Sequence, residues 1–312
     1  MNHAGRNGPE GPTAPADPWF DWLTSRRHGG DPGFEQSVRR TVESYRNRVL
    51  DGAQLAEGMT LLDVGAGDGL IAFGAIARVG PSLKVILADI SAALLQRAEA
   101  VAWQLGVQDS CVFLQGSAER LEAVPEASAD VVTTRAVLAY VQDKAAAARE
   151  FRRVLKPGGR ISLAEPIYRD ESLNLARLAE FVDRRPADPS TLDARLFLRW
   201  KGAQLPATPA DIRASPLTNF TERDLITFFE DAGFGETHLE LHIDMRKAVA
   251  VPWDTFLATA HHPQVPTVRE ILARRFTVEE RRYFEAQMRP VVEAGQIMNR
   301  DMIAYLTAVK PK

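Results

Sequence analysis

The sequence predicts an α/β protein built on a doubly wound, mostly parallel sheet, and three observations support this fold class. Short apolar runs alternate with amphipathic helical segments over residues 51–165, which is the pattern of βαβ units. A glycine-rich turn follows the first run, and a Pro-Gly-Gly turn precedes the fifth. The 312 residues are 45% hydrophobic, enough for one large domain or for a domain with a substantial cap.

Composition and breaks in periodicity divide the chain into seven parts. Proline, glycine and small polar residues in the first segment leave nothing to bury and predict disorder there. We expect a tail at 1–18, N-terminal helices at 19–50, a ligand-binding core at 51–165, a helical insertion at 166–219, a core helix and strand at 220–249, a second helical insertion at 250–299 and a final strand at 300–312.

The most informative segment is the apolar strand at 61–64 and the glycine turn that follows it. Gly65, Gly67 and Gly69 let the backbone turn at positive φ and let a ligand approach without a Cβ in the way. A helix expected at 70–79 directs its unpaired N–H groups toward an anionic part of that ligand. The turn therefore indicates a nucleotide-like cofactor.

The second strand, at 83–89, narrows the choice of cofactor. It ends in Asp89, about twenty residues after the turn, where an acid usually binds ribose hydroxyls. A dinucleotide fingerprint needs a third glycine at position 70, which is Leu70. With Asp63 beginning a D-x-G-x-G-x-G register, the sequence instead resembles the class I S-adenosylmethionine (SAM)-dependent methyltransferases, which share a Rossmann-like sheet of seven strands with the last one antiparallel.

Later segments carry the same resemblance. The loop at 116–121 follows a third strand at 111–114, and a fourth strand and turn occupy 129–138. Pro157 is expected to end a helix, and the two glycines after it turn the chain into a fifth strand at 160–165. A helix at 225–232, an alternating strand and a last strand at 302–310 resemble the end of that fold.

The resemblance implies a set of cofactor-binding residues. It places Asp63 where it orients the loop or meets an ammonium group, and Asp89 where it accepts hydrogen bonds from the ribose. Ser117 stands where an acid is common, which puts one adenine contact in doubt. The implied cofactor residues are Asp63, Gly65, Ala66, Gly67, Gly69, Asp89, Ile90, Ser117, Ala118, Arg135 and Tyr45.

No residue stands out as catalytic, because methyl transfer from a sulfonium needs alignment more than acid or base. Glu165 either orients a nucleophile or bonds the backbone. His261 and His262 titrate near neutrality and are candidate bases, although an exposed loop is the favoured reading. Substrate-wall candidates are Tyr140 beside the sheet and, in the insertions, Trp200, Trp253 and Phe256, for which packing of the cap is an equal alternative.

Composition excludes several other classes. A net charge of −3 and a pI of about 6.1, without blocks of like charge, give no sign of nucleic-acid binding. Cys111 is the only cysteine, so the chain has neither a disulfide framework nor a thiolate metal site. Without a signal peptide or a long apolar run, we expect a cytoplasmic protein that does not bind membranes.

The preferred interpretation is metal-independent methyl transfer from SAM to a small or medium-sized metabolite, similar to quinone-type and natural-product enzymes. The turn after the fourth strand lacks the Asn/Asp-Pro-Pro-aromatic pattern of nucleobase amino methyltransferases. A modified peptide as acceptor, transfer of a group other than methyl and a non-catalytic SAM-binding regulatory protein remain alternatives. The atom methylated is not determined, and neither is the oligomeric state, for which a homodimer stays open.

Overall fold

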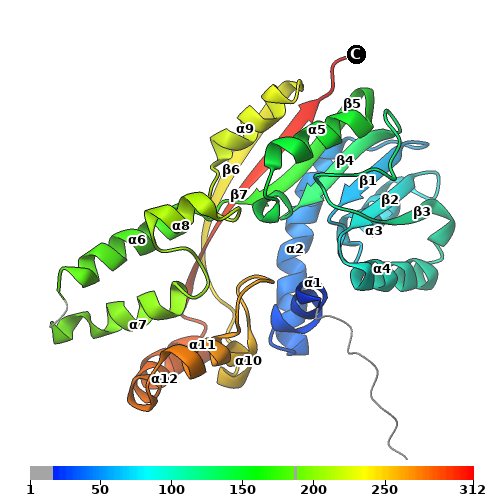
Figure 1. The fold of residues 1–312 in the computed structure, drawn as a ribbon. Coiled ribbons are helices and arrows are strands. Elements are labelled where there is room, and N and C mark those ends of the chain that lie inside the picture. Colours follow the sequence, from blue (N-terminus) through cyan, green and yellow to red (C-terminus); the bar gives the residue numbers. More distant parts are fainter. Residues whose placement is uncertain (1–16, 186–187) are drawn as a thin grey trace, which may run out of the picture.

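A seven-stranded mixed sheet forms the centre of the molecule (Figure 1). The computed structural model describes residues 17–185 and 188–312, so the predicted tail lies outside the described residues except for its last two. The strand order is β3-β2-β1-β4-β5-β7-β6, and only β7 runs antiparallel to its neighbours. The strands are β1 (Thr60–Val64), β2 (Lys84–Asp89), β3 (Cys111–Gln115), β4 (Ala129–Arg135), β5 (Leu155–Pro166), β6 (Gly235–Lys247) and β7 (Met298–Val309).

Helices cover both faces of the sheet, which confirms the doubly wound α/β prediction. Buried residues of α2 (Pro32–Ala53), α3 (Leu70–Val79) and α4 (Ala92–Leu105) share one apolar core with the strands. Residues of α5 (Lys144–Val154) and α9 (Glu222–Asp231) belong to the core on the other face. Burial on two sides explains why the central strands read as continuous apolar runs.

The fifth strand begins earlier than the sequence suggests. Helix α5 ends at Val154, three residues before Pro157, and Leu155 already pairs with Ala129 of β4. The Gly158 N–H donates to the Lys310 carbonyl and the Lys310 N–H to the Gly159 carbonyl, at 2.8 Å each. The predicted glycine turn is therefore a distortion within a paired strand, with a register shift on the β4 side. The last strand likewise begins at Met298 rather than at residue 302.

Strands β6 and β7 continue past the parallel sheet and are joined by the second insertion, whereas the first insertion lies between β5 and α9 (Figure 1). The helices of the two insertions are α6 (Arg169–Asp183), α7 (Leu192–Lys201), α8 (Pro209–Ala214), α10 (Trp253–Ala258), α11 (Val268–Arg275) and α12 (Val278–Glu293). Residues of α7, α10, α11 and α12 bury an apolar core of their own. We call residues 167–219 and 250–298 the cap.

The N-terminal segment forms a strap, residues 17–31, between the sheet and the cap. It contains α1 (Pro18–Asp21) and a short π-helix, η1 (Trp22–Arg26), and it ends at the Gly29-Gly30 break before α2. Gly29 has φ +62°, and a Cβ there would lie 2.3 Å from the Thr255 carbonyl oxygen of α10. The strap thus packs directly on the cap. No helix in the described ranges is long and apolar enough to cross a membrane.

Candidate cofactor and acceptor site

The glycine turn has the backbone that the sequence predicts. Gly65, Gly67 and Gly69 have φ values of +67°, +56° and +84°. A Cβ on Gly65 would lie 2.2 Å from Val137 and one on Gly69 2.2 Å from Phe73, so both positions require glycine for space as well as conformation. A Cβ on Gly67 would meet only Leu23 of the strap, at 3.5 Å. Gly67 therefore presents its backbone to the space under the strap.

Asp89 connects the second strand to this turn. Its Oδ2 accepts a hydrogen bond from the Gly67 N–H at 2.8 Å, and its Oδ1 accepts one from the Ser91 N–H at 2.9 Å. Burial raises the pKa of this carboxyl, while both amides favour the ionised form. The carboxylate holds the glycine turn in place, and each oxygen keeps further lone pairs for a ligand.

Asp63 has a buried carboxylate oxygen without a partner. The Thr133 hydroxyl donates to its Oδ1 at 3.0 Å, whereas its Oδ2 has no hydrogen bond among the described residues. Burial raises the pKa of Asp63 to about 7. Buried polar groups are normally paired, so this oxygen points to a cationic or donor group of a ligand.

Residues that follow β2 and β3 lie at the same ends of the parallel strands as the glycine turn. Ile90, directly after Asp89, is 48% exposed and provides an apolar wall. Ser117 accepts a hydrogen bond from the Glu119 N–H at 3.3 Å within a tight turn, and Ala118 beside it is buried. These positions suit the predicted wall of an adenine pocket.

Glu165 is buried at the end of β5, and both its oxygens bond backbone. Oε1 accepts from the Val137 N–H at 2.9 Å and Oε2 from the Ala139 N–H at 3.1 Å, while burial raises its pKa to about 7. The carboxyl thereby fixes η3 (Leu138–Tyr140). This contact matches the backbone-bonding alternative, and Glu165 is best described as a residue that positions Tyr140.

Aromatic rings from the core and the cap meet beyond the strand ends. Tyr140 packs edge-on against Trp19 of the strap, with ring centroids 4.9 Å apart, and its ring lies 6.1 Å from that of His262. Tyr168, just after β5, packs against His261 at 5.6 Å. The expectation that both histidines lie in an exposed loop is wrong, because the loop folds inward onto these two tyrosines.

Burial of these two histidine and two tyrosine rings favours their uncharged forms. Burial lowers the pKa of His261 well below its ordinary value and also lowers that of His262, whose Nε2 lies 2.9 Å from the Gln204 carbonyl oxygen. Burial raises the pKa values of Tyr140 and Tyr168. Near neutral pH the histidines are therefore uncharged, and His261 Nε2 is buried without a partner.

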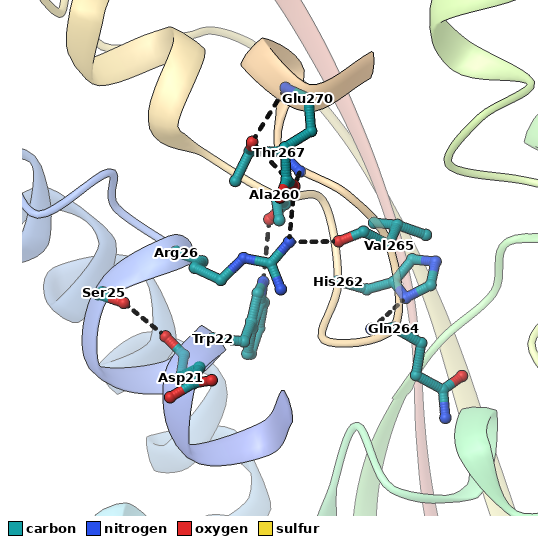
Figure 2. A network of polar contacts seen from close by, with 10 residues as sticks. All are labelled: Asp21, Trp22, Ser25, Arg26, Ala260, His262, Gln264, Val265, Thr267 and Glu270. Atoms are coloured by element: carbon teal, nitrogen blue, oxygen red, sulfur yellow. Dashed lines mark hydrogen bonds and ion pairs between the residues drawn. The ribbon is translucent and has the colours of Figure 1, made fainter. Parts of the chain in front are cut away.

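Figure 2 shows how the strap is fastened to the cap. The Trp22 indole N–H donates to the Ala260 carbonyl at 2.9 Å, and Arg26 donates to the Val265 carbonyl at 2.7 Å. Arg26 also forms an ion pair with Glu270 at 3.5 Å. At its N-terminal end the strap contacts the loop after β2, because the Ser91 hydroxyl donates a hydrogen bond to Asp17. The strap links the glycine turn to the cap.

Comparisons with known proteins agree with this geometry. A family described as a methyltransferase domain matches residues 55–196. The ubiquinone/menaquinone biosynthesis C-methyltransferase UbiE of Hahella chejuensis is 37% identical over 121 residues, which are 39% of this chain and 48% of the relative. The nocamycin O-methyltransferase of Saccharothrix syringae is 36% identical over 149 residues, 46% and 52% of the two chains. Residues 55–196 therefore match a methyltransferase-domain family, and the relatives that share this part of the chain are methyltransferases.

The chain spans about half the length of these curated relatives. Solved structures support the fold over a larger part of the chain. YcgJ of Bacillus subtilis has a TM-score of 0.53 at 19% identity, covering 86% of this chain and 99% of that protein. A geranyl diphosphate C-methyltransferase from Streptomyces coelicolor has a TM-score of 0.50 at 18% identity, covering 90% and 83%.

Three candidates lie away from the glycine turn of the methyltransferase domain, inside the cap. Trp200 and Trp253 are 6% and 5% exposed, and both contact Phe256, with ring centroids 5.8 and 5.2 Å apart. They belong to the apolar core of the cap. The packing alternative therefore explains their burial, and a role in substrate binding stays a prediction.

The Tyr45 hydroxyl is also hydrogen-bonded away from the glycine turn. Its hydroxyl accepts a hydrogen bond from Arg246 at 2.9 Å and lies 3.4 Å from Asp301, on the β6–β7 ribbon. This pairing occupies the hydroxyl, and a role of Tyr45 in cofactor binding stays a prediction.

Sequence reasoning missed Tyr168 and the strap residue Arg27. The position of Tyr168 just after the fifth strand was an available signal, whereas only the tertiary structure reveals Arg27. The described residues contain no group of three or more His, Cys, Asp or Glu side chains arranged to hold a metal ion.

Proposed function

We propose that this chain is a SAM-dependent methyltransferase acting on a small or medium-sized metabolite. The observation that supports this most is the joint arrangement of the glycine turn, the Asp89 carboxylate that holds it and the partnerless oxygen of Asp63. SAM supplies an electrophilic methyl group that is transferred by in-line displacement. The matched domain and the relatives named above, both of which methylate small molecules, support the same proposal.

Each residue has a defined part in this proposal. The Asp63 carboxylate meets the ammonium of the methionine moiety, and Asp89 accepts hydrogen bonds from the ribose hydroxyls. The turn at Gly67 allows the backbone to approach the ligand. Ile90 and Ala118 line the adenine. Each of these contacts uses an atom or surface that the fold leaves available.

The acceptor side is formed by Tyr140, Tyr168, His261 and His262 together with the strap. These neutral, largely buried groups exclude water and orient the acceptor, and alignment is the main requirement of methyl transfer. Leu23 of the strap lies over Gly67, so the strap covers the part of the glycine turn that the cofactor approaches. The fastening of the strap to the cap then closes both sides of the site together.

Calorimetric titration with S-adenosylhomocysteine (SAH) tests the proposal. We expect the wild-type chain to bind it, and Asp89→Ala to lose about 1–3 kcal/mol of binding free energy through lost charged hydrogen bonds. Asp109→Ala, which alters an exposed acid in the short 3₁₀ helix η2 (Gln108–Ser110) just before β3, is the matched control. No binding by wild type, or equal affinities for wild type and Asp89→Ala, would contradict the assignment.

Turnover separates the enzyme from a regulatory SAM-binding protein. Incubation of the full chain with SAM and a panel of phenols, acids, amines and quinols should yield SAH with at least one acceptor. Mass spectrometry of the product should show the addition of one methyl group. Tight SAH binding with no turnover across metabolite and peptide panels would favour the regulatory alternative.

A further inference from the structure

A small cavity next to the glycine turn is lined largely by charged side chains. It has a volume of about 50 Å³ and lies between the strap, α2, the start of α3, α4 and the end of β4. Its charged lining consists of Arg27, Arg39, Arg97, Arg135, Glu35 and Asp68. Four guanidinium groups against two carboxylates leave an excess of positive charge around a space that fits a small polar group.

Arg27 and Arg135, two of the arginines that line this cavity, lack an anionic protein partner. The Arg27 guanidinium lies instead over the Trp22 ring, 5.0 Å from its centroid. In residues 17–185 and 188–312, no carboxylate lies within 4.0 Å of Arg27 or Arg135, and neither side chain makes a hydrogen bond. Burial and then the nearby Arg135 lower the pKa of Arg27 to about 10, although Asp68 partly compensates. Placing two partly buried like charges together is unfavourable unless an anion joins them.

His28 is an independent indication of a ligand. Its side chain lines the same cavity and is only 4% exposed, yet neither ring nitrogen has a hydrogen-bond partner in the described structure. A buried imidazole with both nitrogens unpaired is costly in a folded protein. An imidazole N–H and two guanidinium groups together form a donor set that suits an anion.

We propose that this cavity binds the carboxylate of an acidic methyl acceptor, held by Arg27, Arg135 and His28. This inference rests on the proposed methyltransferase function and adds the chemical class of the acceptor. The planar guanidinium fork matches the geometry of a carboxylate, and the excess of positive charge in the lining favours an anionic group in this small cavity.

The position of the cavity favours the acceptor over the cofactor as the source of this carboxylate. Its lining includes Asp68 and Leu70, and of the cofactor candidates that the sequence implies it contains only Arg135, not Asp63, Asp89 or the glycines of the turn. Arg27 belongs to the strap, whose Trp19 packs edge-on against Tyr140 at the acceptor side. The carboxylate subsite therefore adjoins the acceptor side of the site.

Binding of three fragment probes to the full-length chain saturated with SAH tests this inference. The probes are benzoate, its neutral analogue benzamide, and phenyl phosphate, followed by ligand-observed NMR and calorimetry. We expect benzoate to bind more tightly than the other two. Arg27→Gln and Arg135→Gln should each weaken benzoate binding about tenfold or more, since charge-assisted hydrogen bonds are roughly twice as strong as neutral ones.

Two further variants show whether a loss of benzoate binding comes from the missing guanidinium group or from a protein that no longer folds. Arg27→Lys keeps the charge but not the fork and should retain intermediate benzoate affinity. Arg223→Gln, whose side chain is 90% exposed on α9, is the matched control and should bind benzoate like wild type. Melting temperatures of all variants identify any that do not fold, in which case the remaining arginine variants decide.

The outcomes separate this inference from the proposed function. Equal binding of benzoate and benzamide, tighter binding of phenyl phosphate, or unchanged benzoate affinity in folded arginine variants would overturn the carboxylate assignment. If Arg27→Gln weakens SAH but not 5′-methylthioadenosine, which lacks the amino-acid part, the cavity serves the cofactor and the acceptor assignment is wrong. Failure of wild type to bind SAH would instead refute the methyltransferase proposal.

Discussion

Replacing Asp63 with asparagine should stabilise the free protein and weaken its binding of SAH. The Asp63 carboxyl is buried, and only one of its oxygens has a partner. Asparagine is almost the same size and keeps an acceptor for the Thr133 hydroxyl. The substitution therefore removes the charge without opening a cavity.

The structure gives the sign and size of the stability effect. Burial raises the pKa of Asp63 from 3.8 to about 7, and a rise of this size corresponds to about 4 kcal/mol. For a carboxyl with a raised pKa, the stability it contributes is present below the unfolded value and lost as pH rises through the folded value. The unpaired amide of asparagine costs about 1–3 kcal/mol, so we expect a net gain of about 1–3 kcal/mol near pH 8.

Scanning calorimetry from about pH 5 to pH 8 measures this effect. The melting temperature of Asp63→Asn should exceed that of wild type by a few degrees near pH 8, and the difference should shrink as pH falls. At the higher pH, SAH affinity should drop about tenfold or more through loss of the ammonium contact. Asp109→Asn is the exposed control. A lower melting temperature near pH 8 together with unchanged SAH affinity would refute the reasoning.

The remaining predictions concern the turn, the metal and the cap. Gly67→Val should abolish SAH binding in a folded protein, because a branched side chain resists positive φ and projects toward the ligand space; titration that gives wild-type affinity would contradict this. Methyl transfer should survive treatment with a chelator, and activity lost with EDTA and restored by magnesium would show a metal requirement. Residues 167–219 and 250–298 should exchange amide hydrogens faster than β1 and β4 in the free protein and gain protection when SAH binds. Protection equal to that of the central strands in both states would mean that the cap is a fixed structural element. Trp253→Ala, if folded, should impair acceptor binding more than SAH binding, and a loss of SAH affinity of the same size would contradict the separation of the two roles.

Local signals explain why so much of the core was predictable. The helix at Leu70–Val79 and the strand ending at Asp89 follow from apolar period and glycine chemistry, which act over a few residues. The capping box of Thr277 and Glu280, which begins α12, is a local pattern of the same kind. By contrast, the early start of β5 depends on pairing with Ala129 and with β7, which no local pattern encodes.

The sequence by itself determined the parallel core, the cofactor turn and the acid that ends the second strand, because each depends on the order of neighbouring residues. Only the tertiary structure decided which side chains meet at the acceptor side. His261 and His262 are buried because the cap folds back onto Tyr140 and Tyr168, far from them in the sequence. Arg27 faces Arg135 for the same reason, since the strap crosses the strand ends. Burial and pairing depend on such long-range contacts, and these determine whether a polar residue is solvated, structural or available to a ligand.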